Sequence, residues 1–269
     1  MAVEEEAPTF VDDFDGDALD ESVWFPYYLP AWSSRAQTEA DAEVGGSCLT
    51  LSIPVGQGLW CPDDHPDPLR VSGIQSGSWS GPIGGRGQQR FRDDLVVKEE
   101  QPRFTGWLPE SGSVTIRCRM EISPRSMAAM WLSGFEEDPE QAGELCVVEV
   151  FGRSIERGTA EVGVGVKKVY DPHLVHQFAA PRLAIDVAEL HDYGVEWDEH
   201  VARFTVDGSV VHTAVDPPSY PMQVMIAVFD FPGWSTGGDD DLVPRLVVDR
   251  ITGTAPTGAD GPVSAPAGG

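Results

Sequence analysis

Short segments in which apolar and polar residues alternate recur along the chain, and glycine, proline or acidic residues separate them. The segments 49–53 (LTLSI), 114–120 (VTIRCRM) and 162–166 (VGVGV) alternate with the period of two that is typical of a strand with one buried face. No segment of useful length repeats its apolar residues with a helical period. The pattern predicts an all-β protein in which two antiparallel sheets pack face to face.

The segment 144–151 (ELCVVEVF) differs from the others because it carries two carboxylates inside an otherwise apolar strand. Regular alternation would put Glu144 and Glu149 on opposite faces. A single bulge at Val147-Val148 would return Glu149 to the face of Glu144 and Cys146. Two glutamates that lean toward a ligand can bring their carboxyl groups to about 5–6 Å, the separation expected of a retaining glycosidase. The pair alone also fits a half-buried strand with two solvated glutamates.

This segment resembles the catalytic strand of glycoside hydrolase family 16, the laminarinase, lichenase and agarase group, whose bulged motif is Glu-x-Asp-x-x-Glu. Further segments that are similar to this family follow in the same order along the chain: VDDFDG (11–16), GSVTIRCRM (112–120), AMWL (129–132), HDYGVEW (191–197) with FTVDG (204–208), PM (221–222) with VMIAV (224–228), and VVDRI (247–251). The resemblance covers about residues 10–252. Collinear order makes it more specific than any one motif.

The resemblance implies a concanavalin A-like jelly-roll β-sandwich, whose two curved antiparallel sheets form a concave substrate cleft. It implies a retaining, endo-acting β-glycan hydrolase that cleaves O-glycosidic bonds by double displacement. Glu144 would be the nucleophile and Glu149 the acid/base residue. Two alternatives keep the same cleft. One is a carbohydrate-binding or catalytically weakened relative, and the other is a transglycosylase in which an acceptor sugar replaces water.

Cys146 stands where the family has its central aspartate, and this is the main departure from the motif. The family's aspartate is thought to hold the nucleophile and tune the acid/base residue. A thiol is a weak donor and is uncharged near neutral pH, so it adds no repulsion beside the two glutamates. We therefore expect reduced or altered activity. A nucleophilic Cys146 is disfavoured because neighbouring carboxylates suppress the thiolate.

Sugar rings present apolar faces, so a glycan cleft needs aromatic side chains beside its carboxylates. Trp131 is the first candidate, because the family has a tryptophan at this position near the scissile sugar. Phe151 lies two residues from Glu149 on the same predicted face. Trp107, Tyr170 and Trp234 lie on expected loops and complete the candidate substrate-binding set. Core packing is the alternative for Trp131 and Phe151, and a surface or rim position is the alternative for the other three.

The reaction needs no cofactor, but the resemblance also implies a structural calcium ion. In this family calcium often ties the first strand to the last through one carboxylate and backbone carbonyl groups. Asp249 matches the carboxylate, and Gly46 resembles a carbonyl donor. An ion pair between Asp249 and a nearby arginine is the alternative.

The formal net charge of −26 disfavours nucleic acid and anionic membranes and favours a neutral polysaccharide or oligosaccharide as the partner. We expect one catalytic domain over residues 10–252, an N-terminal extension over 1–9, a disordered Pro/Gly/Ala-rich tail over 253–269, and a monomer. The acidic N-terminus does not resemble a signal peptide, so the chain as given is expected to be cytoplasmic, or secreted if a signal has been removed.

Overall fold

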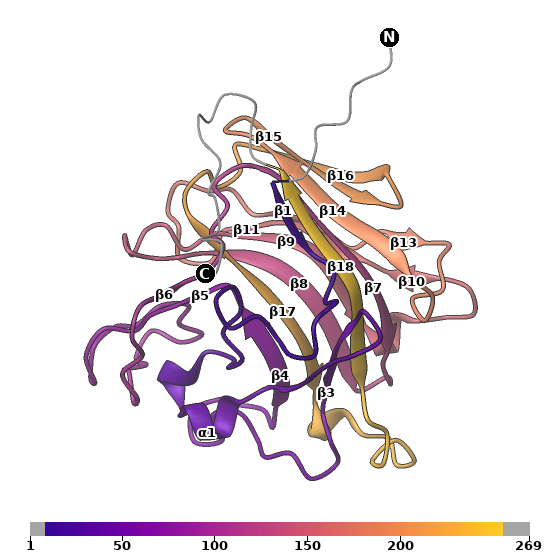
Figure 1. Cartoon of the computed structure of the whole chain (residues 1–269), viewed down its shortest axis with the longest axis horizontal. Helices are drawn as coiled ribbons and strands as arrows, with labels where there is room; N and C mark the ends of the chain where they lie inside the picture. Colours follow the sequence, from indigo (N-terminus) through magenta and orange to yellow (C-terminus); the bar gives the residue numbers. More distant parts are fainter. Residues whose placement is uncertain (1–8, 255–269) are drawn as a thin grey trace, which may run out of the picture.

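Two antiparallel sheets face each other across the core in the computed structural model, which describes residues 9–254 (Figure 1). Within these residues, eight strands form the first sheet: β16 (Ser209–Val215), β15 (Val201–Val206), β14 (His191–Trp197), β7 (Gly112–Glu121), β18 (Arg245–Thr254), β3 (Leu49–Ser52) and β2 (Asp41–Val44) in spatial order, with β1 (Phe10–Asp12) pairing with β18. Six strands of the same part of the chain form the second: β12 (Gln177–Ala179), β11 (Gly163–Lys167), β9 (Glu144–Phe151), β8 (Ser126–Gly134), β17 (Met222–Asp230) and β4 (Arg70–Gln75).

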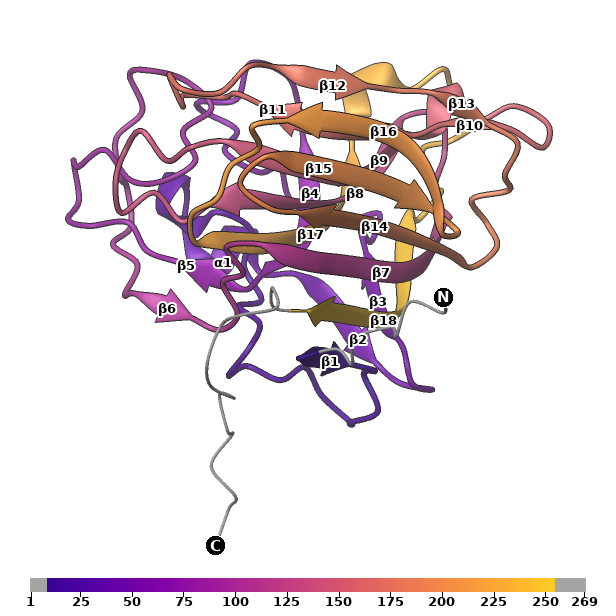
Figure 2. The same cartoon turned by 90° about the horizontal axis from the view of Figure 1, so that it is seen from above.

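The remaining elements are short and lie at the ends and edges of the two sheets. They are the strand pairs β10 (Ala160–Glu161) with β13 (Arg182–Leu183) and β5 (Gly77–Ser78) with β6 (Phe104–Thr105), the helix α1 (Arg35–Thr38), and 3₁₀ turns at Pro30–Trp32, Gly152–Ser154 and Pro232–Trp234. Seen from above, β14, β15 and β16 lie over the strands of the second sheet (Figure 2). The architecture confirms the expected all-β jelly-roll sandwich.

Alternating apolar side chains explain how the two sheets pack. In β7, Val114, Ile116, Cys118 and Met120 are buried while the residues between them are half-buried. These side chains meet inward-facing residues of the second sheet, such as Val148 of β9, in one continuous core. The period of two in the sequence therefore corresponds to one face of each strand in this core.

The strand β17 is buried along its whole length because both of its faces are covered. Val224, Ile226 and Val228 point into the core between the sheets. Met225 and Phe229 point the other way and pack in a second apolar cluster, which also contains residues of the segments 29–32, 60–71 and 95–97. These segments cover the β4 and β17 half of the outer face of the second sheet, so the pocket described below lies toward β8, β9 and β11.

The boundaries of the fold differ slightly from the expected domain. β1 begins at Phe10 as expected, but β18 continues to Thr254, where Gly253 pairs with both Phe10 and Val114. Residues 253 and 254 are therefore part of the sheet and not of the expected tail. The rest of that tail and residues 1–8 of the expected extension lie outside the described residues. Among residues 9–254, the structure contains no helix with the length and apolar character needed to cross a bilayer.

Candidate active site

A β-bulge in β9 brings the two glutamates to the same face of the second sheet. Opposite β8, Cys146 pairs with Trp131 and Val148 pairs with Met130, so Val147 is an extra residue without an opposite partner. The register toward β11 shifts at the same point, between Gly163 and Gly165. The bulge predicted from the spacing of Glu144 and Glu149 is confirmed.

Glycine at position 165 is required by this geometry. Gly165 has a φ angle of 133°, and a Cβ atom there would lie 2.2 Å from the carbonyl oxygen of Gln177 on β12. Any other residue would push β12 away from β11. The alternation of glycine with valine in this strand thus reflects close packing of the backbone beside Cys146, which is the register partner of Gly165.

Glu144, Cys146 and Glu149 line one pocket of about 230 Å³. The other lining residues come from β8, β11, β17 and the N-terminal segment: Tyr28, Met127, Ala129, Trp131, Lys167 and Phe229. Leu145, Val147, Val148 and Val150 of the same strand all lie in the core between the sheets. The structure therefore brings together the three candidate catalytic residues and Trp131.

The two glutamates have different electrostatic surroundings. Burial raises the pKa of Glu144 from 4.5 to about 7, with Lys167 opposing this rise and Glu149 adding to it. Glu149 instead forms an ion pair, in which the Lys167 ammonium donates to its Oε2 atom at 2.8 Å. Desolvation therefore favours the protonated form of Glu144, whereas Glu149 is in direct contact with a cation.

Cys146 lies between them as a neutral thiol. Its side chain is buried, and the Sγ–H group donates weakly to the carbonyl oxygen of Gly163 at 3.6 Å. Burial raises the pKa of this thiol, and both glutamates add to the rise while Lys167 opposes it. Because the thiolate is the nucleophilic form, this environment makes Cys146 a poor nucleophile.

Lys167 lines the catalytic pocket and Gln223 lies outside it, and neither was among the residues selected from the sequence. The register aligns Lys167 of β11, Glu144 of β9, Ser133 of β8 and Gln223 of β17 in one polar row across the sheet. Gln223 is fully buried, and its side-chain nitrogen and oxygen have no hydrogen-bond partner among the described residues. Each residue interrupts an apolar run, and Lys167 is one of only three lysines in the chain. Those are the signals that could have identified them.

Two of the selected aromatic residues lie beyond Glu149, next to the catalytic pocket. A second pocket of about 410 Å³ shares Glu149 with the first and is lined by Phe151, Arg153 and Phe178. The Phe151 ring lies 6.0 Å from the ring of Trp234, which stacks on Phe231 at 4.2 Å. Phe151 and Trp234 therefore form an aromatic surface on the Glu149 side, while Trp131 lies inside the catalytic pocket.

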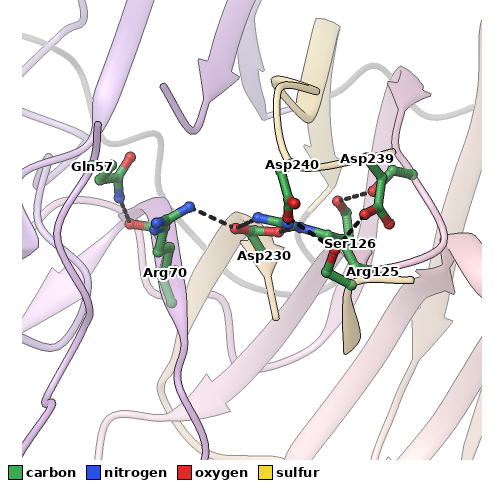
Figure 3. Close-up of polar contacts among 10 residues, drawn as sticks. Gln57, Arg70, Arg125, Ser126, Asp230, Asp239 and Asp240 are labelled. Carbon is green, nitrogen blue, oxygen red and sulfur yellow. Dashed lines mark hydrogen bonds and ion pairs between the residues drawn. The ribbon is translucent and has the colours of Figure 1, made fainter. Parts of the chain in front are cut away.

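A buried ion network holds the loop that carries Trp234 (Figure 3). The Arg125 guanidinium donates to both carboxylate oxygens of Asp230, at 2.6 and 2.8 Å, and to Asp240 at 2.6 Å. The Arg125 and Asp230 side chains are only 5% and 3% exposed. Ser235 donates to Asp239 and Asp240 within the same loop. Bidentate pairing of this kind fixes geometry, so the loop after β17 is anchored beside the start of β8.

The other two aromatic candidates lie elsewhere. Trp107 stacks on Phe10 with ring centroids 4.0 Å apart and packs against the core, and it lines neither the catalytic pocket nor the second pocket. Tyr170 lies against the guanidinium group of Arg90, 5.1 Å from its ring centroid, and does not line the catalytic pocket. A loop position gave no information on which side of the sandwich either ring would lie.

The proposed calcium ligands show an ion pair and a turn. The Asp249 carboxylate forms an ion pair with Arg117, in which Oδ2 lies 3.3 Å from Nε, and this is the alternative considered above. Gly46 lies in an exposed turn between β2 and β3 with a φ angle of 61°. Within residues 9–254, no three or more His, Cys, Asp or Glu side chains gather into a metal-binding group. The one carboxylate offered to calcium, that of Asp249, is already paired with Arg117, so these residues fit the ion poorly.

Solved structures of known proteins share this fold. An endo-β-galactosidase from Clostridium perfringens that releases GlcNAcα1-4Gal is 22% identical, with a TM-score of 0.75 over 91% of this chain, which spans 60% of that chain. The laminarinase catalytic domain from Thermotoga maritima MSB8 is 12% identical, with a TM-score of 0.63 over 93% of this chain and 98% of its own. A laminarinase from Flavobacterium sp. UMI-01 is 15% identical, with a TM-score of 0.61 over 92% of this chain and 100% of its own.

A pair of carboxylates beside aromatic side chains, in the pocket of a jelly-roll sandwich, is typical of a glycoside hydrolase. The family model described as Glycosyl hydrolases family 16 matches residues 110–243, which include both glutamates. The chain belongs to glycoside hydrolase family 16. A search of curated proteins finds no match.

Proposed function

We propose that the protein is a retaining, endo-acting hydrolase of β-glycans. The observation that carries the proposal is the position of Glu144 and Glu149 on one face of the bulged strand, in a pocket that also contains Trp131. Two carboxylates that flank the scissile bond, one as nucleophile and the other as acid/base residue, support double displacement with retention of the anomeric configuration.

In this mechanism Glu144 attacks the anomeric carbon, and the bond to the leaving oxygen breaks as an ester bond to Glu144 forms. Glu149 gives its proton to the leaving oxygen. In the second step Glu149 takes a proton from water, the water oxygen attacks the anomeric carbon, and Glu144 is released as a carboxylate. The pair therefore needs one proton in all, and the first step needs that proton on Glu149. In the substrate-free site Glu149 forms the ion pair with Lys167 and desolvation favours the protonated form of Glu144, so the proton must move to Glu149 when the sugar binds.

An endo-acting enzyme must bind sugars on both sides of the cleaved bond. The second pocket, which continues from Glu149 past Phe151, offers such space next to the catalytic pocket. Aromatic rings there can stack on the apolar faces of sugars. The net charge of −26 favours a neutral glycan.

The activities of the proteins with similar structures indicate which sugars to test first. One set acts as endo-1,3-β-glucanases or laminarinases, and another releases GlcNAcα1-4Gal as an endo-β-galactosidase. The proposal is tested by incubating the protein with β-1,3-glucan, mixed-linkage β-glucan and β-galactosidic glycans, and by measuring new reducing ends. Proton NMR of the first products then distinguishes retention from inversion.

Glu144→Gln and Glu149→Gln should each abolish cleavage of any glycan that the wild type cleaves. The matched control is Glu189→Gln, because Glu189 is exposed and lies outside both pockets. Near-normal activity of either cleft variant would contradict the assigned roles. An initial product with inverted configuration would contradict double displacement.

Cys146 supports a second candidate function, a catalytically weakened or carbohydrate-binding relative. A neutral thiol replaces the expected aspartate, and Lys167 holds the acid/base residue in an ion pair. Binding of a glycan by calorimetry without any new reducing ends would favour this candidate. A transglycosylase would instead give longer products when an acceptor oligosaccharide is added.

A further inference from the structure

We propose that Lys167 is a positioning residue that sets the charge of the glutamate pair in this chain, in combination with the neutral thiol of Cys146. The inference rests on the proposed function, because it assigns Lys167 to the same two-glutamate site. Lys167 contacts the carboxylate of the acid/base residue Glu149, and it lies outside the Glu-x-Cys-x-x-Glu motif of the catalytic strand.

The geometry of β11 brings the ammonium group to both glutamates. Lys167 is the register partner of Glu144, but its Nζ atom bonds Oε2 of Glu149, which pairs with Gly163 four residues earlier on β11. Gly165, which lies between these two points, and Gly163 itself carry no side chain. The lysine side chain can therefore extend along the sheet, past Cys146, from one glutamate to the other.

Phe178 of β12 supports this conformation from the opposite side. The Lys167 ammonium lies 4.7 Å from the centroid of its ring, a distance at which a cation is attracted to the face of an aromatic ring. Two independent contacts, one ionic and one with an aromatic ring, thus hold Nζ over the pocket. The Lys167 and Glu149 side chains are 27% and 18% exposed, so water screens their attraction only partly.

The charge balance explains why the cation matters. A site with three acidic side chains would carry three negative charges when fully ionised. With Cys146 neutral, the two glutamates and Lys167 together carry a net charge of −1 when both glutamates are ionised, and zero when one holds a proton. The singly protonated pair that double displacement requires is therefore the electrically neutral form of this site.

Other ionisable groups face the site from neighbouring elements and act on it less directly. Tyr28 and Glu136 both interact electrostatically with Glu144, and Arg86 and Arg90 partly compensate Glu136. On the far side of Lys167, His176 lies beside Phe178, and His212 of β16 contacts the carbonyl group of Gln177. Within residues 9–254, Lys167 is the one lysine or arginine that forms an ion pair with Glu144 or Glu149.

The neutral form has a defined pH range. The pair loses its two protons in two steps, and desolvation of Glu144 raises the pKa of this carboxyl group to about 7. Removing the cation raises the pKa of both steps, since each produces a negative charge that Lys167 no longer compensates. Both limbs of the pH–rate profile should then move to higher pH.

The test compares wild type with Lys167→Met and Lys167→Arg. The Met variant should shift both limbs upward by about one to two pH units, the size typical of losing one adjacent opposite charge. It should therefore retain more of its own maximal activity at alkaline pH than the wild type does. Lys167→Arg keeps the cation and should keep the wild-type limbs. A lysine with only a structural role would lower activity at every pH and leave both limbs in place, and that result would overturn the proposal.

Cys146→Asp adds a negative charge at the same site and provides a second approach to the charge balance. It should move the limbs in the same direction as Lys167→Met, and the double variant should move them further. A shift in the opposite direction for Cys146→Asp would also overturn the proposal. If Lys167→Met does not fold, Lys167→Gln and Cys146→Asp still test in which direction the two limbs of the pH–rate profile move.

A titration without turnover separates this inference from the proposed function. Carboxyl ¹³C NMR of protein labelled at glutamate, assigned with Glu144→Gln and Glu149→Gln, reports ionisation directly. In Lys167→Met both signals should titrate at higher pH than in the wild type. If no glycan is cleaved but the signals shift, the proposed hydrolysis fails and the inference about Lys167 stands. If the folded variant shows unchanged titration of both signals, the inference fails whether or not the protein is a hydrolase.

Discussion

Glu144→Gln should stabilise the fold, and the gain should depend on pH. Burial raises the pKa of Glu144 from 4.5 to about 7, so keeping this side chain in the folded protein is unfavourable once the carboxyl group would otherwise ionise. Below the unfolded-state pKa both states hold the proton, and there is no penalty. The penalty grows as the pH rises and is complete above the folded-state pKa. Glutamine has nearly the same shape and no charge, so it removes the penalty.

The magnitude follows from the difference between the two pKa values. Each unit corresponds to about 1.4 kcal/mol, so the full penalty is about 3 kcal/mol. At about pH 5 most of this penalty is absent, and the free energy of unfolding of Glu144→Gln should exceed that of the wild type by about 1 kcal/mol or less. At about pH 8.5 the gain should approach about 3 kcal/mol, which corresponds to several degrees in melting temperature for a protein of this size.

Urea unfolding followed by tryptophan fluorescence, at both pH values, measures these free energies. Glu149→Gln is the matched contrast, because it breaks the ion pair with Lys167 and should lower stability by about 0.5–1 kcal/mol. Glu189→Gln should change little at either pH, since that side chain is exposed. If the effect of Glu144→Gln is the same at both pH values, Glu144 is not desolvated, and the pocket is open to bulk water.

Further predictions concern the thiol, the aromatic residues and the proposed metal site. Cys146→Asp buries a third carboxylate and should lower the free energy of unfolding by about 1–3 kcal/mol near neutral pH. Thermal unfolding of this variant and of Cys146→Ser measures the loss. Trp234→Ala should raise KM for a long glycan about fivefold with little change in kcat. Trp107→Ala should instead lower the melting temperature and leave KM unchanged. Equal effects of the two substitutions on KM and melting temperature would contradict the different surroundings of these two rings. Because Asp249 already pairs with Arg117, chelator and added calcium should leave the melting temperature unchanged, and a clear shift with either would show a bound ion.

The glutamate pair shows how far local patterning determines a site. Their spacing in an apolar strand required a bulge if both were to face a cleft, and the structure has that bulge at Val147. Side-chain alternation is a property of the strand itself, so it can be inferred from one segment. The same reasoning identified the inward-facing residues of β7, because the face that each residue occupies depends only on its position in the strand.

Trp107 shows where that reasoning ends. Its loop position was compatible with a cleft role, but the ring stacks on Phe10 beside β18 instead. Which rings meet is decided by how distant segments fold over the sheets, and the spacing of residues along the chain carries no information on this. The same limit explains why the apolar cluster formed by segments 29–32, 60–71 and 95–97 over β17 was not anticipated.

The sequence by itself thus determined the all-β class, the alternation within strands and the shared face of Glu144, Cys146 and Glu149. Only the tertiary structure decided that Lys167 lies opposite Glu144 and bonds Glu149, because that contact depends on the register between β9 and β11. Backbone groups are the same in every residue and can pair in more than one register, so this register is set by the packing of side chains and by the connections between the strands. The charge of the catalytic pair is therefore a property of strand pairing, although every residue that contributes to it is visible in the sequence.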